Sequence, residues 1–151
     1  MTTDERRSLI EQLSAVPGRV RQAAQAAQGR IRPPGEWSIN AVVGHLGRVE
    51  AEVWQARFQQ VEANESPTWD SWEPDGVDWE GEYGGRPLDR LLADFESARQ
   101  ASLRHLEGLS DVGWRRVGTH RRWGEVDVLY LCREMLKHDD VHVGQIRLVG
   151  A

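Results

Sequence analysis

The sequence is poor in the features that would mark a secreted or membrane-bound protein. Its single cysteine, Cys132, excludes an intramolecular disulfide and fits a reducing compartment. No apolar run approaches the roughly 20 residues that a membrane span needs. The N-terminal stretch MTTDERRSLIEQL is charged and lacks the apolar region of a signal peptide. We therefore expect a cytoplasmic protein without a membrane partner.

An excess of positive charge is also missing. The 24 Asp and Glu residues outnumber the 19 Lys and Arg residues, which leaves a formal net charge of −5. No basic patch stands out along the chain, so nucleic acid is not an expected partner. The length of 151 residues suits one domain with its own core, and we predict a single domain over residues 1–151.

Apolar residues recur every three or four positions in several long segments, which is typical of amphipathic helices. These segments cover residues 4–28, 39–63, 88–107 and about 128–149. Ser38 and Asp127 stand where N-caps of the second and last helices are expected, and Ser110 suits the cap of a short turn. Pro17-Gly18 predicts a kink or break in the first helix. No segment reads as a convincing strand, so the predicted fold is an all-α four-helix bundle.

A long irregular loop is predicted between the second and third helices. Residues 64–85 show neither helical nor strand periodicity, and a loop of this length is usually functional or disordered. Trp69, Trp72 and Trp79 argue against disorder. We expect the loop to cover one end of the bundle as a lid. Its tryptophans either stack on a ligand or pack the bundle end, and packing is the favoured reading.

His138 and His142 lie in the apolar stripe of the last helix. Four residues correspond to about 400° of helical rotation, so the two imidazoles differ in direction by only ~40°. A buried imidazole needs partners for both ring nitrogens, and a metal supplies one partner per ring. Helical bundles build metal sites from side chains of this kind. The alternative is a pair of hydrogen-bonded core histidines.

Two histidines do not complete a metal site, because three or more protein ligands are usual. The stretch H-D-D-V-H differs from the zinc-protease pattern H-E-x-x-H, since Asp139 is shorter than glutamate. Only nine residues follow His142, and none is His, Asp or Glu, so the third ligand is expected upstream. His45, at the margin of the inward stripe of the second helix, is the best candidate. His105 is a weaker one, and His120 lies in a segment, Arg115 to Gly124, that reads as a basic loop.

Residues 35–54 and 114–149 resemble the DinB-like superfamily, which includes the bacillithiol transferases and the metal-dependent mycothiol enzymes. The shared pattern is a W-S entering a helix that carries H-L, and a final helix that carries H-x-x-x-H-x-x-Q-I. In this chain the pattern consists of Trp37-Ser38, His45-Leu46, His138, His142 and Gln145-Ile146.

The resemblance implies a four-helix bundle in which His45, His138 and His142 bind one divalent metal and leave coordination positions open. Zn²⁺, Ni²⁺, Fe²⁺ and Mn²⁺ all suit imidazole and water ligands, so the ligand set does not select one of them. The resemblance also implies an S-transferase or isomerase that uses a low-molecular-weight thiol cosubstrate. A homodimer is common among bundles of this kind.

Two classes of function follow. The first is a metal-dependent thiol S-transferase acting on a small-molecule electrophile, in which the metal lowers the pKa of a bound thiol or water. The second is a non-catalytic, stress-related metal-binding bundle that acts through a partner or by sequestering metal. Because histidine must lose its proton to bind metal, the metal is expected to leave as the pH falls near 6.

Several neighbouring residues have two interpretations each. Cys132 points some 120° away from His138, so a small core residue is favoured over a nucleophile. Glu50 and Glu134 are each about one turn from a histidine, and each is either an acceptor for an imidazole N–H or an exposed carboxylate. Gln145 could hydrogen-bond near the site, and the aspartates between the histidines are expected to turn away from it. The arginines at 115, 116, 121 and 122 either bind an acidic cosubstrate or form a solvated loop.

Overall fold

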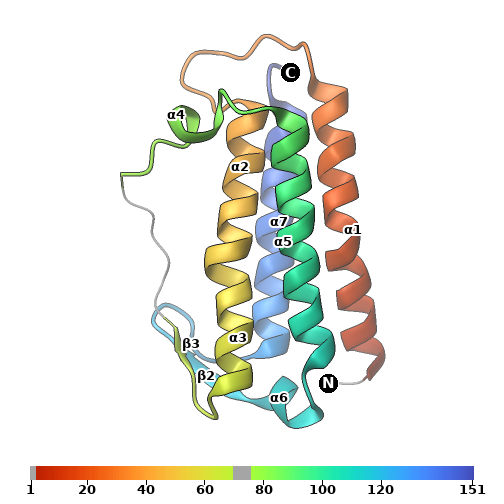
Figure 1. The fold of residues 1–151 in the computed structure, drawn as a ribbon, viewed down its shortest axis with the longest axis vertical. Helices are drawn as coiled ribbons and strands as arrows, with labels where there is room; N and C mark the ends of the chain where they lie inside the picture. Colours follow the sequence, from red (N-terminus) through yellow and green to blue (C-terminus); the bar gives the residue numbers. More distant parts are fainter. Residues whose placement is uncertain (1–2, 70–75) are drawn as a thin grey trace.

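The amphipathic segments fold into four long helical runs that pack side by side (Figure 1). The computed structural model describes residues 3–69 and 76–151. The long runs are α1 (Thr3–Ala27), α2 (Ile39–Val49) continued by the π-helix η1 (Glu50–Trp54) and α3 (Gln55–Ala63), α5 (Leu88–Gly108), and α7 (Val128–Leu148). The predicted four-helix bundle is therefore confirmed. Trp72, which the sequence placed in the loop, lies outside the described residues.

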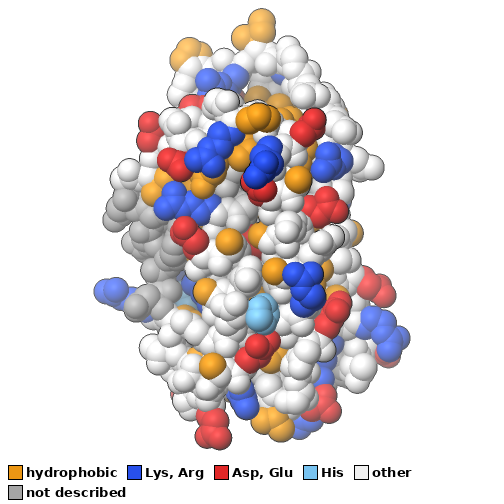
Figure 2. Space-filling model, in the orientation of Figure 1, with side chains coloured by type: hydrophobic (Ala, Val, Ile, Leu, Met, Phe, Trp, Pro, Cys, Tyr) orange, Lys and Arg blue, Asp and Glu red, His pale blue; other side chains and the backbone are white. Residues whose placement is uncertain are grey.

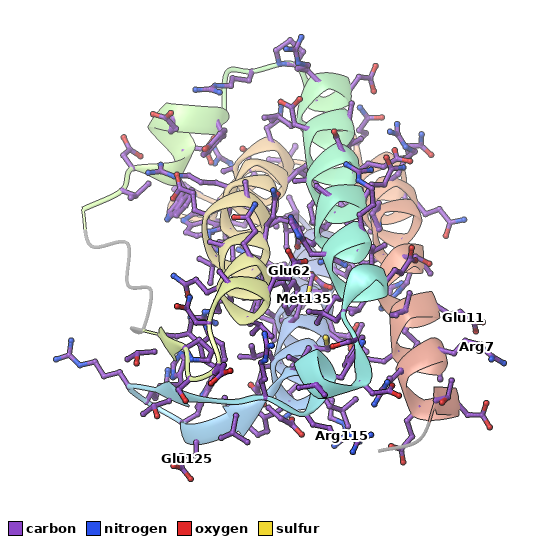
Figure 3. The ribbon with its side chains drawn as sticks, turned by 60° about the horizontal axis from the view of Figure 1, so that its bottom comes forward. Arg7, Glu11, Glu62, Arg115, Glu125 and Met135 are labelled. Carbon is purple, nitrogen blue, oxygen red and sulfur yellow. The ribbon has the colours of Figure 1, made fainter. Side chains whose placement is uncertain are left out.

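Two neighbouring pairs of helices run parallel. Figure 1 shows α1 and α7 running in one direction and α2–α3 and α5 running in the other. The segment between α3 and α5 carries the chain back to the end of the bundle where α2 begins, so α5 starts beside it. The most extensive packing is between α2 and α5 and between α1 and α7. In Figure 3, Met135 lies among the helices, whereas Arg7 and Glu11 project outward from α1.

The helix starts follow the capping residues that the sequence predicts. The Ser38 hydroxyl accepts a hydrogen bond from the backbone N–H of Ala41, and the Asp127 carboxylate accepts one from Tyr130. Ser110 caps α6 (Asp111–Arg115) in the same way. Each cap satisfies a backbone donor that has no partner within its helix.

The sequence predicted a kink or a break at Pro17-Gly18, and the break is absent because α1 is continuous from Thr3 to Ala27. A proline inside a helix has no N–H and leaves the carbonyl four residues earlier without its helical partner. Here that carbonyl belongs to Leu13, and Nη1 of Arg99 donates a hydrogen bond to it at 2.8 Å. A donor from α5 thus replaces the missing one, and the helix continues.

A small sheet closes one end of the bundle, contrary to the prediction of a strand-free chain. It contains β1 (Thr68–Trp69), β2 (Val117–His120) and β3 (Gly124–Asp127), with β2 in the middle. β1 pairs with β2 in parallel, and β2 pairs with β3 antiparallel. The buried positions of β2 are Gly118 and His120. Because neither is apolar, the alternation that signals a strand is missing, and the segment read as a basic loop.

The connection between α3 and α5 is more ordered than the irregular loop that the sequence predicts. Besides β1 it contains α4 (Trp79–Tyr83), which packs against α2. Gly44 of α2 allows this contact, because a Cβ there would lie 2.2 Å from Cγ of Tyr83. The sequence offers no apolar periodicity over five residues, so this short helix gave no signal.

Figure 2 shows acidic and basic side chains interspersed over the face that it presents. Among the described helices, none combines the length and apolar character required to cross a membrane.

Candidate metal site

The structure brings together the three histidines that the sequence singled out. His45 comes from α2, and His138 and His142 come from consecutive turns of α7. Nε2 of His138 lies 3.4 Å from Nε2 of His45 and 3.2 Å from Nε2 of His142. One ligand atom from each of the three residues lies within 4.8 Å of the other two. Side chains about ninety residues apart in the sequence therefore converge on one point.

Burial keeps these histidines uncharged. The pKa of His45 falls from 6.5 to about 3, chiefly because the ring is buried and also because His142 and His138 are close. Burial, followed by the nearness of His142 and Arg99, lowers the pKa of His138 to about 4. Burial also lowers the pKa of His142, against the opposing effect of its hydrogen bond with Gln145. Neutral imidazole is the form that binds a metal.

Gln145 sets the orientation of His142, as the sequence anticipated. Its Oε1 lies 2.8 Å from Nδ1 of His142, an arrangement in which the ring donates its Nδ1–H to the amide oxygen. The Nε2 lone pair of His142 then points toward the other two rings. A metal-binding histidine usually has such a partner on its second nitrogen.

The donor set fits a divalent metal. The Nε2 atom of His138 faces two other ring nitrogens, and a hydrogen bond between neutral imidazoles can satisfy only one such pair. A third facing nitrogen leaves a lone pair without a proton, at a cost inside a protein. One cation would accept all three lone pairs at once, and three histidine ligands with further positions open are typical of catalytic zinc sites.

Tryptophan rings form the walls around the histidines. The Trp79 ring meets the His45 ring edge-on at 4.5 Å between centroids, and the Trp37 ring lies 5.4 Å from it. Trp54 approaches His138 at 6.4 Å. Trp79 is buried, so its packing role is the one that the structure supports. These rings limit the access of water to the group.

Glu80 holds α4 against the start of α2. Its Oε1 accepts hydrogen bonds from the backbone N–H of Ser38 at 2.6 Å and from Arg32 at 2.5 Å, and its Oε2 accepts one from the Ser38 hydroxyl at 2.7 Å. The N-cap residue of α2 therefore has its own N–H capped by a carboxylate from α4, in the manner of a capping box. This contact places Trp79 next to His45.

A groove of about 700 Å³ adjoins the histidine group. Trp37 and Gln145 line the groove, and each also contacts one of the histidines. Val141, Leu148 and Val149 add apolar wall. The volume lies within the range of small-molecule sites.

The two glutamates near the histidines have other partners. Glu50 is neither exposed nor bonded to an imidazole, because it is buried and paired with Arg99. Glu134 pairs with Lys137 at 2.9 Å. Both interpretations of Glu50 were therefore wrong, since sequence spacing does not reveal a partner on another helix.

Cys132 is a core residue, as predicted. It is fully buried, and burial raises the pKa of its thiol above the ordinary value. A buried neutral thiol is a poor nucleophile.

The remaining histidines and the arginine cluster lie outside the group. His105 pairs with Glu62 at 2.8 Å on the surface. His120 is buried in the sheet, where its Nδ1 accepts hydrogen bonds from the backbone N–H groups of Arg122 and Trp123. Arg116 donates to carbonyls near the end of α3. Figure 1 places α6 and the hairpin at the end of the bundle opposite α4, so this segment lies at the other end from Trp79.

Sequence reasoning missed Arg99 and underrated Asp139. Arg99 follows Phe95 by four residues in the apolar stripe of α5, and an arginine at an inward position signals a buried partner. Asp139 follows Met135 by four residues and is likewise buried. Asp140, by contrast, is exposed and pairs with Arg19. Asp139 is paired with Arg99 and Asp140 with Arg19, so each aspartate has a partner other than a histidine, and Asp140 lies at the surface.

Fold and site together define a four-helix bundle with a group of three histidines, one buried and two half-buried, which indicates a metal centre. The chain belongs to the DinB superfamily, whose model matches residues 7–146. A solved structure is also similar, with a TM-score of 0.78 at 17% sequence identity over 97% of this chain and 86% of the other. It is YfiT from Bacillus subtilis, described as a probable metal-dependent hydrolase with an unusual four-helix bundle topology. Comparison with curated proteins gave no match.

Proposed function

We propose that the protein is a metal-dependent enzyme in which His45, His138 and His142 bind one divalent ion. The observation that carries the proposal is the convergence of three neutral imidazole nitrogens, with Nε2 of His138 within 3.4 Å of both others. When bound, the ion supplies Lewis-acid chemistry, since an open coordination position lowers the pKa of a thiol or water and yields a nucleophile at neutral pH.

The residues around the group support a reaction with a small electrophile. Gln145 orients His142, and the rings of Trp37 and Trp79 shield His45 from water. The adjoining groove has a mixed apolar and polar lining and shares Trp37 and Gln145 with the group. We propose a thiol S-transferase that works in or beside this groove. A low-molecular-weight thiol gives its proton to solvent, its sulfur forms a bond to the electrophilic carbon, and the bond from that carbon to the leaving group breaks, so that the leaving group departs with the electron pair.

A second candidate uses water in place of the thiol. The structural similarity to YfiT, described as a probable metal-dependent hydrolase, favours it. The same histidines, Gln145 and groove would serve, and the two reactions differ only in the nucleophile.

Metal analysis tests the site first. Protein purified without chelator or affinity histidines should contain about one divalent ion per chain. His45→Ala, His138→Ala and His142→Ala should each lower that content. His105→Ala is the matched control and should leave it unchanged, because His105 pairs with Glu62 at the surface. Unchanged metal content in the three site variants would refute the site.

A substrate panel then tests the reaction. The metal-loaded protein is incubated with small electrophiles, with and without a low-molecular-weight thiol, and both thiol consumption and hydrolysis are measured. Thiol-dependent turnover that disappears in His142→Ala supports the transferase. Turnover without thiol supports the hydrolase. Full metal binding without turnover of either kind would support a non-catalytic, metal-binding role through a partner.

A further inference from the structure

A buried ion cluster lies on the helical runs that carry the histidine group. Arg99, Glu50 and Asp139 each expose no more than 2% of their side chains. Nε of Arg99 donates to Oε2 of Glu50 at 2.9 Å, and Nη2 donates to Oε1 of Glu50 at 2.8 Å and to both oxygens of Asp139 at 2.8 and 2.9 Å. Burying three charges is expensive, so their retention calls for an explanation.

This one arginine contacts all four long helical runs. It stands on α5, and it binds Glu50 at the start of η1, Asp139 on α7 and the Leu13 carbonyl on α1. The Leu13 carbonyl is free to accept because Pro17 cannot donate to it. A planar guanidinium with five donors in fixed directions can hold several partners at defined angles, which a lysine cannot do.

Two of these partners belong to the helical runs that carry the histidines. Asp139 directly follows His138, and Glu50 is five residues after His45 in the same helical run. A shift of α2 relative to α7 would therefore break contacts in the ion cluster and separate the histidines together.

We propose that Arg99 is the positioning residue of the histidine group, and that the Arg99–Glu50–Asp139 cluster fixes the α2 and α7 turns at the separation that three-histidine binding requires. The inference rests on the proposed metal site.

The test replaces the whole cluster at once, because removing one member would leave a buried charge without its partner. The variant Glu50→Gln/Arg99→Met/Asp139→Asn keeps similar side-chain volumes and carries no buried charge. The matched control is Arg19→Met/Asp140→Asn, which removes an exposed ion pair, 2.9 Å long, that also joins α1 to α7. Arg99→Lys is a second variant, which keeps the positive charge and loses the planar guanidinium with its fixed donor directions.

Three readouts are used: the dissociation constant for Co²⁺, the visible spectrum of the Co²⁺ form, and a metal-free crystal structure. We expect the triple variant to bind Co²⁺ at least tenfold more weakly, with an altered spectrum and a His45–His138 Nε2 separation above the 3.4 Å seen here. Arg99→Lys should shift the dissociation constant in the same direction, and the surface control should match the native protein. If the triple variant does not fold, Arg99→Lys decides the question with the same readouts.

Native Co²⁺ affinity and native histidine spacing in the triple variant or Arg99→Lys would overturn the inference. Failure of the proposed function looks different. If the native protein and His142→Ala take up Co²⁺ equally, the metal site is wrong, while the metal-free crystal structure still decides whether the cluster positions the histidines.

Discussion

Nδ1 of His142 lies 2.8 Å from Oε1 of Gln145, one turn further along α7. The contact has two effects. It favours the tautomer of His142 that carries its proton on Nδ1, so the lone pair on Nε2 is free to bind a metal. It also holds the ring toward His138 and His45. Gln145 also lines the groove beside the group, so the residue that orients a candidate ligand is within reach of a bound small molecule.

Replacing Gln145 should weaken metal binding without unfolding the protein. Gln145→Ala removes the acceptor for the His142 N–H, and loss of such a partner typically costs about 10–100-fold in metal affinity. Gln145→Glu keeps an acceptor and makes it anionic, so its affinity should equal or exceed the native value. Competition with a chromophoric chelator measures both. Equal affinity in all three proteins would show that the contact is incidental.

The stability of the metal-free protein should fall in mild acid. The folded state holds the pKa of His45 at about 3 and of His138 at about 4, below the ordinary 6.5. The unfolded chain therefore takes up protons that the folded chain refuses. Stability is full above pH 6.5 and declines as the pH drops from 6.5 toward 4, by at most about 1.4 kcal/mol per pH unit for each histidine.

Asp139 opposes this trend in part of the range. Burial raises the pKa of its carboxyl to about 6, so the folded state also takes up a proton there. His45→Gln isolates the contribution of one histidine. Urea titrations between pH 7.5 and 4.5 should give this variant a shallower loss of stability than the native protein. If the two proteins lost stability equally as the pH fell, the folded state would not lower the pKa of His45.

Metal release should occur at a lower pH than the sequence suggested. An ordinary histidine would lose its metal near pH 6, but two of these rings resist protonation to about pH 4 even without metal. Metal content after dialysis at pH 7, 5.5 and 4 measures the release, which we expect mainly below 5.5. Complete loss already at pH 6 would contradict the buried environment described here.

Replacing Gly44 with alanine should lower the stability of the protein, whereas replacing Gly47 with alanine should raise it. Each gains about 1 kcal/mol of helix propensity. At Gly47 the added Cβ meets Phe95 at an ordinary 3.7 Å, so the gain should appear as a higher melting temperature. At Gly44 the Cβ would lie 2.2 Å from the Tyr83 ring, so α4 must move and take Trp79 away from His45. Calorimetry and hydrogen exchange of α4 test the pair. If Gly44→Ala raised the melting temperature while the amides of α4 stayed protected from hydrogen exchange, Gly44 would not be needed for the packing of α4 on α2.

Glu80→Ala should release α4 from α2. The substitution removes the carboxylate that accepts from the Ser38 N–H, the Ser38 hydroxyl and Arg32, and losing a helix cap typically costs about 1 kcal/mol. Glu82→Ala is the control, because Glu82 pairs with Arg86 on the exposed face and such pairs contribute roughly 0.5 kcal/mol or less. Urea unfolding gives the stabilities. If both variants lost the same free energy of unfolding, the hydrogen bonds from Ser38 to Glu80 would contribute no more than the surface ion pair.

Residue pattern alone identified the long helices because their signals are local. Apolar spacing marks α5 and α7, and Ser38 and Asp127 cap the helices that follow them by bonding backbone groups three residues away. The short elements lacked such signals. β2 turns Gly118 and His120 inward, and α4 spans only five residues, so their order comes from contacts with Trp69 and with Gly44.

In the candidate site, too, some features follow from the sequence and others only from the structure. His138 and His142 share a helix face by spacing alone, and His45 was singled out by its place in an inward stripe and by the family pattern. Arg99 stood in the apolar stripe of α5, which signals a buried partner, but nothing in the sequence says that the partners are Glu50 and Asp139. Pro17 read as a break for the same reason, since its compensating donor comes from another helix.

The sequence by itself determined the four amphipathic helices, their caps and the histidines worth testing, because these depend on residues a few positions apart. Only the tertiary structure decided that three Nε2 atoms meet, that Glu50 faces Arg99 rather than an imidazole, and that α4 covers His45. These depend on how helices pack, and the free energy of burial is shared among residues that are distant in the chain. The histidine pair on α7 becomes a candidate metal site only when α2 brings His45 beside it.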